Sequence, residues 1–528
     1  MDTETFLRTS YTLIRSVAAV PPGTSAPTLP STSTLSTARS SIPSPSSPNA
    51  LTGRGPAATL AHLTTDIAPA LAGHNRSGRY YGFVTGSTLP VAEAADNLVS
   101  ALDNSLQVHL PGQSVATEVE DVALRLLLRL LGLDLDDGGG GEGWAGRTFT
   151  TGATASNVLG LACGREAVIS ARLPPGSADG GGVGELGLLG ACAAAGVKEI
   201  QVLTSMGHSS LSKAASVVGL GRSAVKELRY SEAEPWRLDL DAVERELQRE
   251  GVASIVAVSA GEVNTGRFAT TSVEEMRRLR DLADKYKAWI HVDGAFGIFA
   301  RALPATSEFA RLRDFTAGLE LADSITVDGH KLLNVPYDTG IFFTRSSHTP
   351  QAVFQNPNAV YLSTPTPSSG PAIPSPLNIG LENSRRFRAL PVYAVLLSEG
   401  AAGVADMLAR MVRLARGIAG AIARDDELRG DYELLAALTA EQKGVGGKEE
   451  ENTHIVVLFR ARDSGLNAKL VEKIQASGDW YVSGTKWEGQ PACRIAVASW
   501  RVNVDEDLAF VKGRLAGIAK EWKDGGSK

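Results

Sequence analysis

The chain has 528 residues, of which 52 are Lys or Arg and 58 are Asp or Glu, so its formal net charge is −6. Apolar residues make up 43% of the chain and charged residues 21%, which is enough for a sizeable buried core. The mildly acidic charge argues against nucleic acid or an anionic membrane as a partner. Only three scattered cysteines are present, so the composition excludes a disulfide-rich mini-domain, a zinc cluster, collagen and a coiled coil.

The N-terminal segment carries weak targeting signals. Met1–Arg8 contains two acids and lacks the basic and apolar regions of a signal peptide, although the stretch to Arg39 would also fit a poor transit peptide. Residues 21–57 are dominated by Pro, Ser, Thr and Ala, which predicts a flexible segment over residues 1–57 or an arm laid over a partner subunit. No run of about 18 uninterrupted apolar residues occurs, so we expect a cytoplasmic protein without a membrane partner.

Short apolar runs alternate with helical patterns through the middle of the chain. Helical periodicity covers Val115–Leu131 and Ser272–Tyr286. This alternation predicts an α/β fold with a mainly parallel seven-stranded sheet and helices on both faces. The expected strands are Arg147–Thr150, Lys198–Thr204, Val225–Tyr230, Ser254–Ser259, Trp289–Val292, Ser324–Val327 and Gly340–Thr344.

A different pattern follows after about residue 395. A long helix is expected over Leu396–Arg424, followed by strands at His454–Phe459 and Arg494–Ser499, which indicates a smaller C-terminal α+β domain. Glycine-rich runs at Gly138–Gly143, Gly180–Gly187 and Gly444–Glu451 are expected to be surface loops. The predicted division is a flexible segment (1–57), an N-terminal arm (58–114), a large domain (115–395) and a small domain (396–528).

Polar residues follow four of the expected strands, at the sheet edge where α/β proteins gather ligands. They belong to Thr151–Asn157, Ser205–Ser210, Asp293–Phe296 and Asp328–Lys331. Taken singly, each has an ordinary explanation as a helix cap or a solvated side chain. Together they supply a helix N-terminus for a phosphate, a lysine for a Schiff base, a carboxylate for a pyridinium nitrogen and an imidazole for the ring face. These groups make up a pyridoxal phosphate site.

The same residues resemble the group II pyridoxal-phosphate-dependent amino-acid decarboxylases, the family of the aromatic-amino-acid, tyrosine and glutamate decarboxylases. The similarity runs from about Tyr80 to Arg501. The segment that starts at Asp328 reads Asp-Gly-His-Lys-Leu-Leu-Asn-Val-Pro-Tyr-Asp. Its first four residues are similar to the family's motif, which is Asn or Asp, any residue, His and Lys. The resemblance implies a fold-type I pyridoxal-phosphate enzyme in which Lys331 is the Schiff-base lysine, with Asp328 and His330 as cofactor contacts.

Further residues take roles from the same resemblance. Asp293 is the expected partner of the pyridine nitrogen and Ala295 part of the ring's cradle, because residues 291–295 are similar to the family's His-Val-Asp-Ala-Ala run. His208, in His-Ser-Ser, is expected to stack on the ring and act in catalysis. The turn over residues 151–157 provides Ala153 and Thr154 as the expected phosphate contacts.

The expected lid tyrosine and two departures from the family concern the substrate side. Tyr361, 30 residues after Lys331, stands where the family carries a loop tyrosine, so the resemblance implies that it donates a proton to the substrate carbon, with an ordinary surface tyrosine as the alternative. The family's Gly-Thr-Thr turn is replaced by Gly261–Gly266, so Asn264 is the predicted substitute contact. Phe296 stands where a tyrosine is common in the family, directly after the run similar to His-Val-Asp-Ala-Ala. Cofactor identity is therefore better defined than substrate identity.

The sequence thus predicts a carboxy-lyase, and the family resemblance implies that it is a homodimer with active sites at the subunit interface. It would remove the α-carboxylate of an aromatic or related L-amino acid to give an amine and CO2. The alternatives are another pyridoxal-phosphate reaction on the same fold, such as aldol cleavage or transamination, and a dinucleotide-binding or scaffold protein. The last rests on Gly219-Leu-Gly221, an incomplete glycine fingerprint. No metal site is expected.

Overall fold

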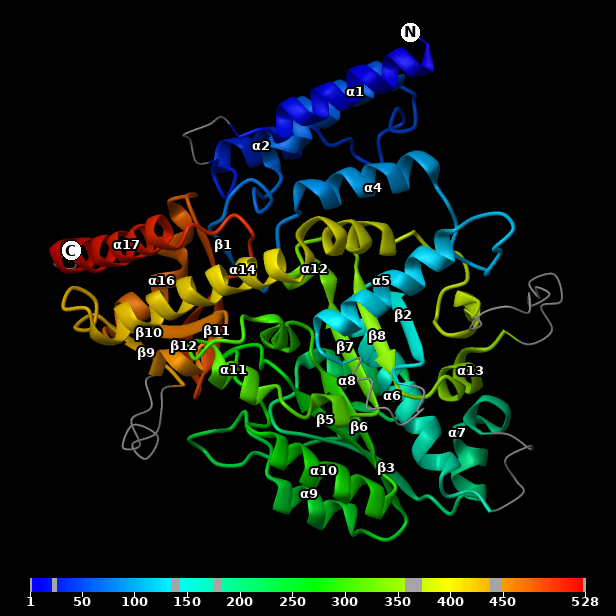
Figure 1. Cartoon of the computed structure of the whole chain (residues 1–528). Helices are drawn as coiled ribbons and strands as arrows, with labels where there is room; N and C mark the ends of the chain where they lie inside the picture. Colours follow the sequence, from blue (N-terminus) through cyan, green and yellow to red (C-terminus); the bar gives the residue numbers. More distant parts are fainter. Residues whose placement is uncertain are drawn as a thin grey trace. The chain divides into compact units, whose positions relative to one another are not determined.

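The computed structural model describes residues 2–20, 26–133, 143–174, 182–356, 373–436 and 449–525 (Figure 1). The chain forms two compact units. The larger unit comprises Thr88–Gly420 and Ala436–Val457, and the smaller comprises Met1–Ser87, Ala421–Leu435 and Leu458–Lys528. The boundary expected at residues 395/396 therefore falls inside the larger unit, and residues 1–87 belong to the same unit as the C-terminal strands.

The larger unit contains a seven-stranded sheet in the order β2-β8-β7-β6-β5-β3-β4. β8 is antiparallel to both of its neighbours, and the other four pairings are parallel, so the predicted mainly parallel sheet is confirmed. All seven strands occur where they were expected, and β4 ends three residues early. Their bounds are β2 (Gly146–Thr150), β3 (Glu199–Thr204), β4 (Val225–Glu227), β5 (Val252–Ser259), β6 (Trp289–Asp293), β7 (Ser324–Asp328) and β8 (Gly340–Thr344).

Local capping signals fix several helices of the larger unit. The hydroxyl of Ser272 accepts a hydrogen bond from the Glu275 N–H, which starts the predicted helix over Val273–Tyr286, and Lys287 ends it in a left-handed conformation. The helices are α4 (Pro90–Leu102), α5 (Ala116–Leu130), α6 (Ala153–Ser170), α7 (Val183–Ala194), α8 (Ser209–Val217), α9 (Leu240–Leu247), α10 (Val273–Tyr286), α11 (Ala310–Phe315), α12 (Gly329–Leu332), α13 (His348–Phe354) and α14 (Ala389–Arg424).

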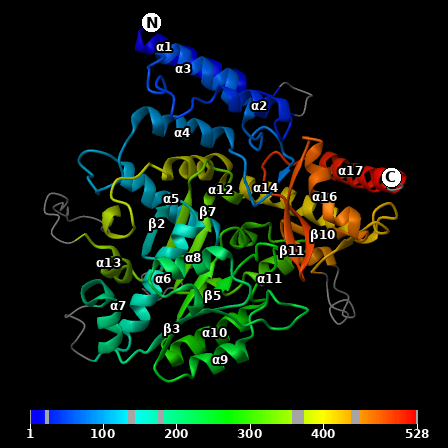
Figure 2. The same ribbon diagram turned by 180° about the vertical axis from the view of Figure 1, so that it is seen from behind.

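Helices cover both faces of the sheet. α6 contacts β5, β6, β7 and β8 and packs beside α8, and both helices lie in front of the sheet in the view from behind (Figure 2). α9 and α10 lie together in Figure 1 and contact β5 and β6 respectively. The core under α6 includes Leu161, Val202 and Ile255, which are completely buried.

Two glycines let α6 approach β6 closely. A Cβ atom at Gly160 would lie 2.3 Å from the His291 ring, and one at Gly164 would lie 2.9 Å from the Trp289 ring. Residues four apart share a helix face, and residues two apart share a strand face. The Gly160–Gly164 face of the helix therefore lies directly on the side chains of His291 and Trp289.

Glycine also explains where α7 begins. A surface loop was expected over Gly180–Gly187, but α7 begins at Val183, so the prediction is wrong from that residue onward. The Glu166 carboxylate accepts the Val183 N–H at 2.9 Å, and a Cβ atom at Gly182 would lie 1.6 Å from that carboxylate. Of the other predicted loops, residues 138–142 and 444–448 lie outside the described residues.

The smaller unit contains a five-stranded sheet in the order β1-β11-β12-β10-β9. Its strands are β1 (Tyr80–Tyr81), β9 (Tyr432–Leu434), β10 (Val456–Ala461), β11 (Tyr481–Trp487) and β12 (Gln490–Ala496), and its helices include α1 (Thr3–Ala18), α2 (Thr32–Ser41), α3 (Pro56–His62), α16 (Ser464–Ala476) and α17 (Val504–Gly525). α1 and α2 lie inside the segment that was expected to be flexible. Asp2 and Ser31 cap them, so local polar residues start helices that composition alone did not predict.

α14 is the longest helix, and it begins seven residues before the predicted start. It changes direction at Gly400, whose φ of 59° is left-handed. By length and composition it is apolar enough to cross a membrane. Val404, Leu408, Met411, Ala415 and Ile418 are buried within the protein, so packing in the core accounts for its apolar composition.

Candidate active site

The carboxyl ends of β2, β5, β6 and β7 meet at one edge of the large sheet. Asp293 at the end of β6 pairs in register with Ser259 of β5 and Thr326 of β7. Asp328, the last residue of β7, pairs with Gly340 of β8, which in turn pairs with Thr150 at the end of β2. The strand register thus brings together three of the four polar segments that the sequence had singled out, those that follow β2, β6 and β7.

Lys331 and Asp328 form an ion pair at this edge. The Lys331 Nζ lies 2.9 Å from the Asp328 Oδ2. Asp328 is 2% exposed, and its Oδ1 is buried without a hydrogen-bond partner among the described residues. A buried carboxylate oxygen without a donor indicates that a further group belongs beside it.

His330 lies in α12, next to Lys331 in the sequence, and is enclosed by the start of α6. Its Nδ1 lies 3.2 Å from the Thr339 amide nitrogen, and its ring lies 4.6 Å from that of Tyr337. Burial lowers the pKa of His330, and the carboxylate of Asp328 opposes that shift. The imidazole therefore stays neutral at pH 7.

The start of α6 lies against this histidine. A Cβ atom at Gly152 would lie 3.3 Å from the His330 ring, and Gly340 leaves room for the Gly152 backbone. No side chain caps α6, whose first residues are Ala153 and Thr154. The unpaired N–H groups and the positive end of the helix dipole at this point favour an anion such as a phosphate.

A directional chain of hydrogen bonds supports Asp293 from behind. The Trp289 indole, which can only donate, bonds the Ser324 hydroxyl at 2.9 Å, and that hydroxyl lies 2.8 Å from the His291 Nδ1. The His291 Nε2 lies 3.0 Å from the Asn157 Oδ1, and the Asn157 amide donates to the Asp293 Oδ2 at 2.9 Å. Burial lowers the pKa of His291 to about 4, so the ring is neutral with its proton on Nε2.

The same asparagine reaches His208. Its amide donates to the Ser210 hydroxyl at 3.1 Å, and this hydroxyl lies 2.7 Å from the His208 Nδ1. The Ser210 backbone N–H also donates to Nδ1 at 3.2 Å, which makes His208 the N-cap of α8. Because Nδ1 accepts, the proton of a neutral His208 lies on Nε2.

An aromatic stack lies on another side of Lys331. The Phe296 ring centroid is 5.8 Å from the Lys331 Nζ. His454 stacks on Phe296 with centroids 6.3 Å apart and lies 6.0 Å from the Phe268 ring. Both ring nitrogens of His454 are buried without a hydrogen-bond partner among the described residues, and burial lowers its pKa to about 3. His454 thus behaves as an apolar ring.

The remaining expected site residues have different outcomes. Ala295 directs its N–H toward the Asp293 Oδ1 at 3.3 Å, and its place in the cradle of the ring stays a prediction. Asn264 donates from its backbone and its side chain to the Glu262 Oε1, at 2.9 and 3.2 Å, so its cofactor contact stays a prediction. Tyr361 lies outside the described residues.

Sequence reasoning missed Asn157, His291 and His454 as parts of the site. Asn157 was named only as the end of a turn, although it lies one helical turn after Ala153, one turn before Gly160 and two turns before Gly164. That spacing is the one signal that could have indicated a residue facing the sheet. Nothing in the local sequence of His454 indicates its stacking.

Comparison with known proteins identifies the family of the chain. The model of the pyridoxal-dependent decarboxylase conserved domain matches residues 80–436. The L-2,4-diaminobutyrate decarboxylase of Acinetobacter baumannii is 27% identical over 447 residues, which cover 82% of this chain and 78% of that protein. Tryptophan decarboxylase 1 of Oryza sativa subsp. japonica is 23% identical over 450 residues, covering 84% of this chain and 80% of that protein.

Solved structures give the same fold. The crystal structure of Oryza sativa TDC with PLP and tryptamine superposes with a TM-score of 0.75 at 21% identity and covers 98% of both chains. The predicted fold class and cofactor are therefore confirmed. Since the family model covers more than half of the sequence, the chain belongs to the pyridoxal-dependent decarboxylase family and is a pyridoxal-phosphate-dependent carboxy-lyase.

Proposed function

We propose that this carboxy-lyase acts on an aromatic or related L-amino acid, with Lys331, Asp293 and His208 carrying the chemistry. In that reaction the bond between Cα and the carboxylate breaks, CO2 leaves, and a proton takes its place at Cα. The observation that carries the residue assignment is the meeting of these side chains at the carboxyl ends of β3, β6 and β7, where Asn157 bonds both Asp293 and the Ser210 hydroxyl beside His208. Bound pyridoxal phosphate supplies the sink for the electrons of the broken bond.

The residues present fit this cofactor. The uncapped start of α6 suits its phosphate, and the unpaired Oδ1 of Asp328 is buried where a further polar group is needed. Ala295 and Gly152 are small residues that keep this edge open. Lys331 provides the amine that attaches the cofactor and then gives way to the amine of the substrate.

Asp293 holds a proton at the pyridine nitrogen in this proposal. A carboxylate can do this only if its oxygens stay in position, and here the Asn157 amide and the Ala295 N–H each bond one oxygen. The hydrogen-bond chain that begins at Trp289 fixes which way the Asn157 amide faces. Asn157 is therefore a positioning residue.

His208 presents a defined tautomer. Its Nδ1 accepts hydrogen bonds from Ser210, so Nε2 carries the proton that can be held toward the reacting carboxylate or returned to Cα.

Tyr361 is the second proposed donor to Cα. We expect Tyr361→Phe to suppress amine formation and to divert the reaction to a reaction with O2 that yields an aldehyde. Mass spectrometry of the products measures both. An unimpaired amine yield would remove Tyr361 from the mechanism.

The test of the whole assignment is Lys331→Ala in the protein purified with its cofactor. We expect the loss of the visible absorbance that arises from cofactor bound to this lysine, together with the loss of turnover. An unchanged spectrum would contradict the assignment of Lys331. Lys213→Ala, which removes a lysine of α8, is the control and should keep the spectrum.

The substrate test is CO2 release from a panel of aromatic, basic and acidic L-amino acids, with products identified by mass spectrometry. We expect release from aromatic or related substrates. A relative from Petunia hybrida, 24% identical over 452 residues, is named phenylacetaldehyde synthase, so an aldehyde product is the second candidate. Turnover without CO2 would instead indicate aldol cleavage or transamination.

We also propose a cytoplasmic homodimer with active sites at the subunit interface. Leu7, Tyr11 and Ile14 of α1 lie four and three residues apart and are 42%, 44% and 46% exposed, so one face of this helix presents apolar side chains. Such a face is typical of a contact between chains. Light scattering should give a dimer, and a monomer would contradict this proposal; fractionation of cells should recover the enzyme in the cytosol.

A further inference from the structure

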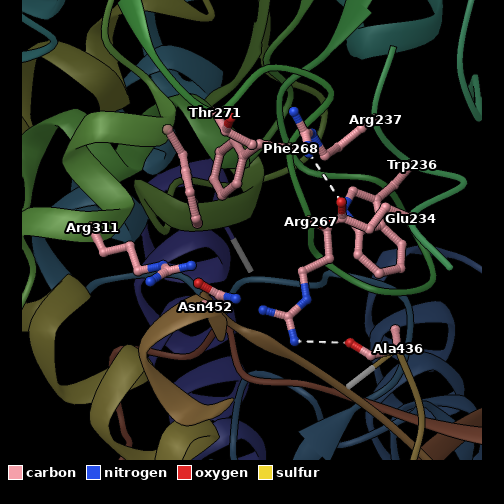
Figure 3. Close-up of a pocket in the computed structure, with 10 residues that line it drawn as sticks. Glu234, Trp236, Arg237, Arg267, Phe268, Thr271, Arg311, Ala436 and Asn452 are labelled. Carbon is pink, nitrogen blue, oxygen red and sulfur yellow. Dashed lines mark hydrogen bonds and ion pairs between the residues drawn. The ribbon is translucent and has the colours of Figure 1, made fainter. Parts of the chain in front are cut away.

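A cavity of about 110 Å³ lies in the larger unit, beyond the aromatic stack (Figure 3). Phe268, which contacts His454, lines it, and Arg267 precedes this phenylalanine just after the turn that follows β5. Arg311 comes from α11, and Asn452 ends the 3-10 helix Glu449–Asn452. In the view of Figure 3, the amide of Asn452 lies between the guanidinium groups of Arg311 and Arg267.

The lining of this cavity carries more positive than negative charge. Arg237 is matched by two acids, Glu234 at 3.0 Å and Glu275 at 2.7 Å. Arg267 and Arg311 add two more cations, and among the described residues of the lining Glu234 is the one acid. The cavity therefore has an excess of positive charge, which favours an anion.

Arg311 makes no ion pair or hydrogen bond with any residue that the structure describes. Its recorded contact is with the ring of Phe315, 5.6 Å from the guanidinium carbon, and its Nε is buried without an acceptor. Guanidinium N–H groups are strong donors, and leaving one buried without an acceptor is costly. An oxyanion in the cavity would supply the acceptor.

Asn452 is a second polar group without a partner. It is 7% exposed, and its Oδ1 is buried without a hydrogen bond to the described part of the chain. A half-turn of the amide exchanges the oxygen and the NH2 group, so this residue can offer two donors to an anion. Arg267, which is also 7% exposed and donates to the Ala436 carbonyl at 3.1 Å, adds charge on the same cavity.

We propose that this cavity binds a small oxyanion, a phosphate or a short carboxylate, between Arg311, Arg267 and Asn452. One bound water needs about 10–15 Å³, so a cavity of about 110 Å³ has room for a phosphate or a short carboxylate. Neither Lys331 nor Asp293 lines it, so this site is distinct from the proposed cofactor site. Its occupation does not depend on the substrate of the enzyme.

The experiment is calorimetric titration of the enzyme loaded with pyridoxal phosphate, so that the cofactor's own phosphate site is filled. Inorganic phosphate and acetate are titrated separately at an ionic strength held constant with sodium chloride. We expect one site per chain, and the tighter of the two anions identifies the source. Binding of neither anion would overturn the proposal.

Variants locate the site. Arg311→Gln removes the unpaired cation and should weaken binding at least about tenfold, since a hydrogen bond to a charged group is involved. Arg311→Lys keeps the charge and should bind the anion with an affinity between those of the wild type and Arg311→Gln. Asn452→Asp should weaken binding by adding a negative charge. Arg277→Gln, on the exposed face of α10, is the matched control and should bind like the wild type. Equal affinity in Arg311→Gln and the wild type would overturn the proposal.

Discussion

Two regions that flank the site each bury a histidine, and they treat it in opposite ways. Behind Asp293, His291 is completely buried and bonded at both ring nitrogens, to Ser324 and Asn157. Beside Lys331, His454 is equally buried, but neither nitrogen has a hydrogen-bond partner among the described residues, and the ring stacks on Phe296. Burial keeps both rings neutral, with pKa values of about 4 and about 3.

The difference shows what a buried polar ring contributes in each setting. His291 passes a hydrogen-bond direction from Trp289 to the amide that holds Asp293, so its polarity is used. His454 fills space between two phenylalanine rings, so its polarity is not used. Substitutions in the first region should therefore lower the stability of the protein strongly, whereas substitutions of His454 should change it little.

The largest expected effect comes from Asn157→Leu. This change removes a donor from Asp293 and an acceptor from His291 and Thr326, and each buried group left unpaired costs about 1–3 kcal/mol. We expect a loss of several kcal/mol in the free energy of unfolding and a lower rate of turnover, measured by denaturant titration and CO2 release. Wild-type turnover in this variant would show that Asp293 needs no support.

Gly160→Ala should have the next largest effect. The added Cβ would lie 2.3 Å from the His291 ring, so helix α6 or the ring has to move, at a cost of about 1–3 kcal/mol in unfolding free energy. The control is Gly513→Ala in α17, where nothing lies within 4 Å and alanine should stabilise the helix by about 0.5–1 kcal/mol. Equal stability of the two variants would contradict the close approach of α6 to β6.

The smallest effect at pH 7 is expected for His454→Leu, within about 1 kcal/mol of the wild type, because no hydrogen bond is lost. The distinctive effect of this substitution on stability appears at acidic pH. The pKa of His454 in the folded chain lies below its ordinary value of about 6.5, so the unfolded chain binds the proton first and stability falls as the pH drops below about 6.5.

Between about pH 6 and pH 4, His454→Leu should flatten this loss by about 1.4 kcal/mol per pH unit, the share of one proton. Denaturant titrations across that range measure the slope. Met276→Leu, at a completely buried position without a titratable side chain, is the control and should keep the wild-type slope. An unchanged slope in His454→Leu would show that the His454 ring is not buried in solution.

The strands and the first set of site residues could be predicted because their signals are local. β6 and β7 are short segments rich in β-branched and aromatic residues, and Asp293 and Asp328 stand at their carboxyl ends. Parallel strands align their carboxyl ends, so placing the residues at strand ends was sufficient to bring them to one edge. The family resemblance then supplied the cofactor.

The tertiary structure alone decided the rest. Asn157 and His291 are 134 residues apart, and their contact depends on Gly160 and Gly164 letting α6 lie directly on β6. The union of residues 1–87 with the C-terminal strands, and the cavity shared by Arg311, Arg267 and Asn452, likewise join segments distant in sequence. Local patterns determine which way a side chain points along its own helix or strand, but its partner is fixed only when the elements pack.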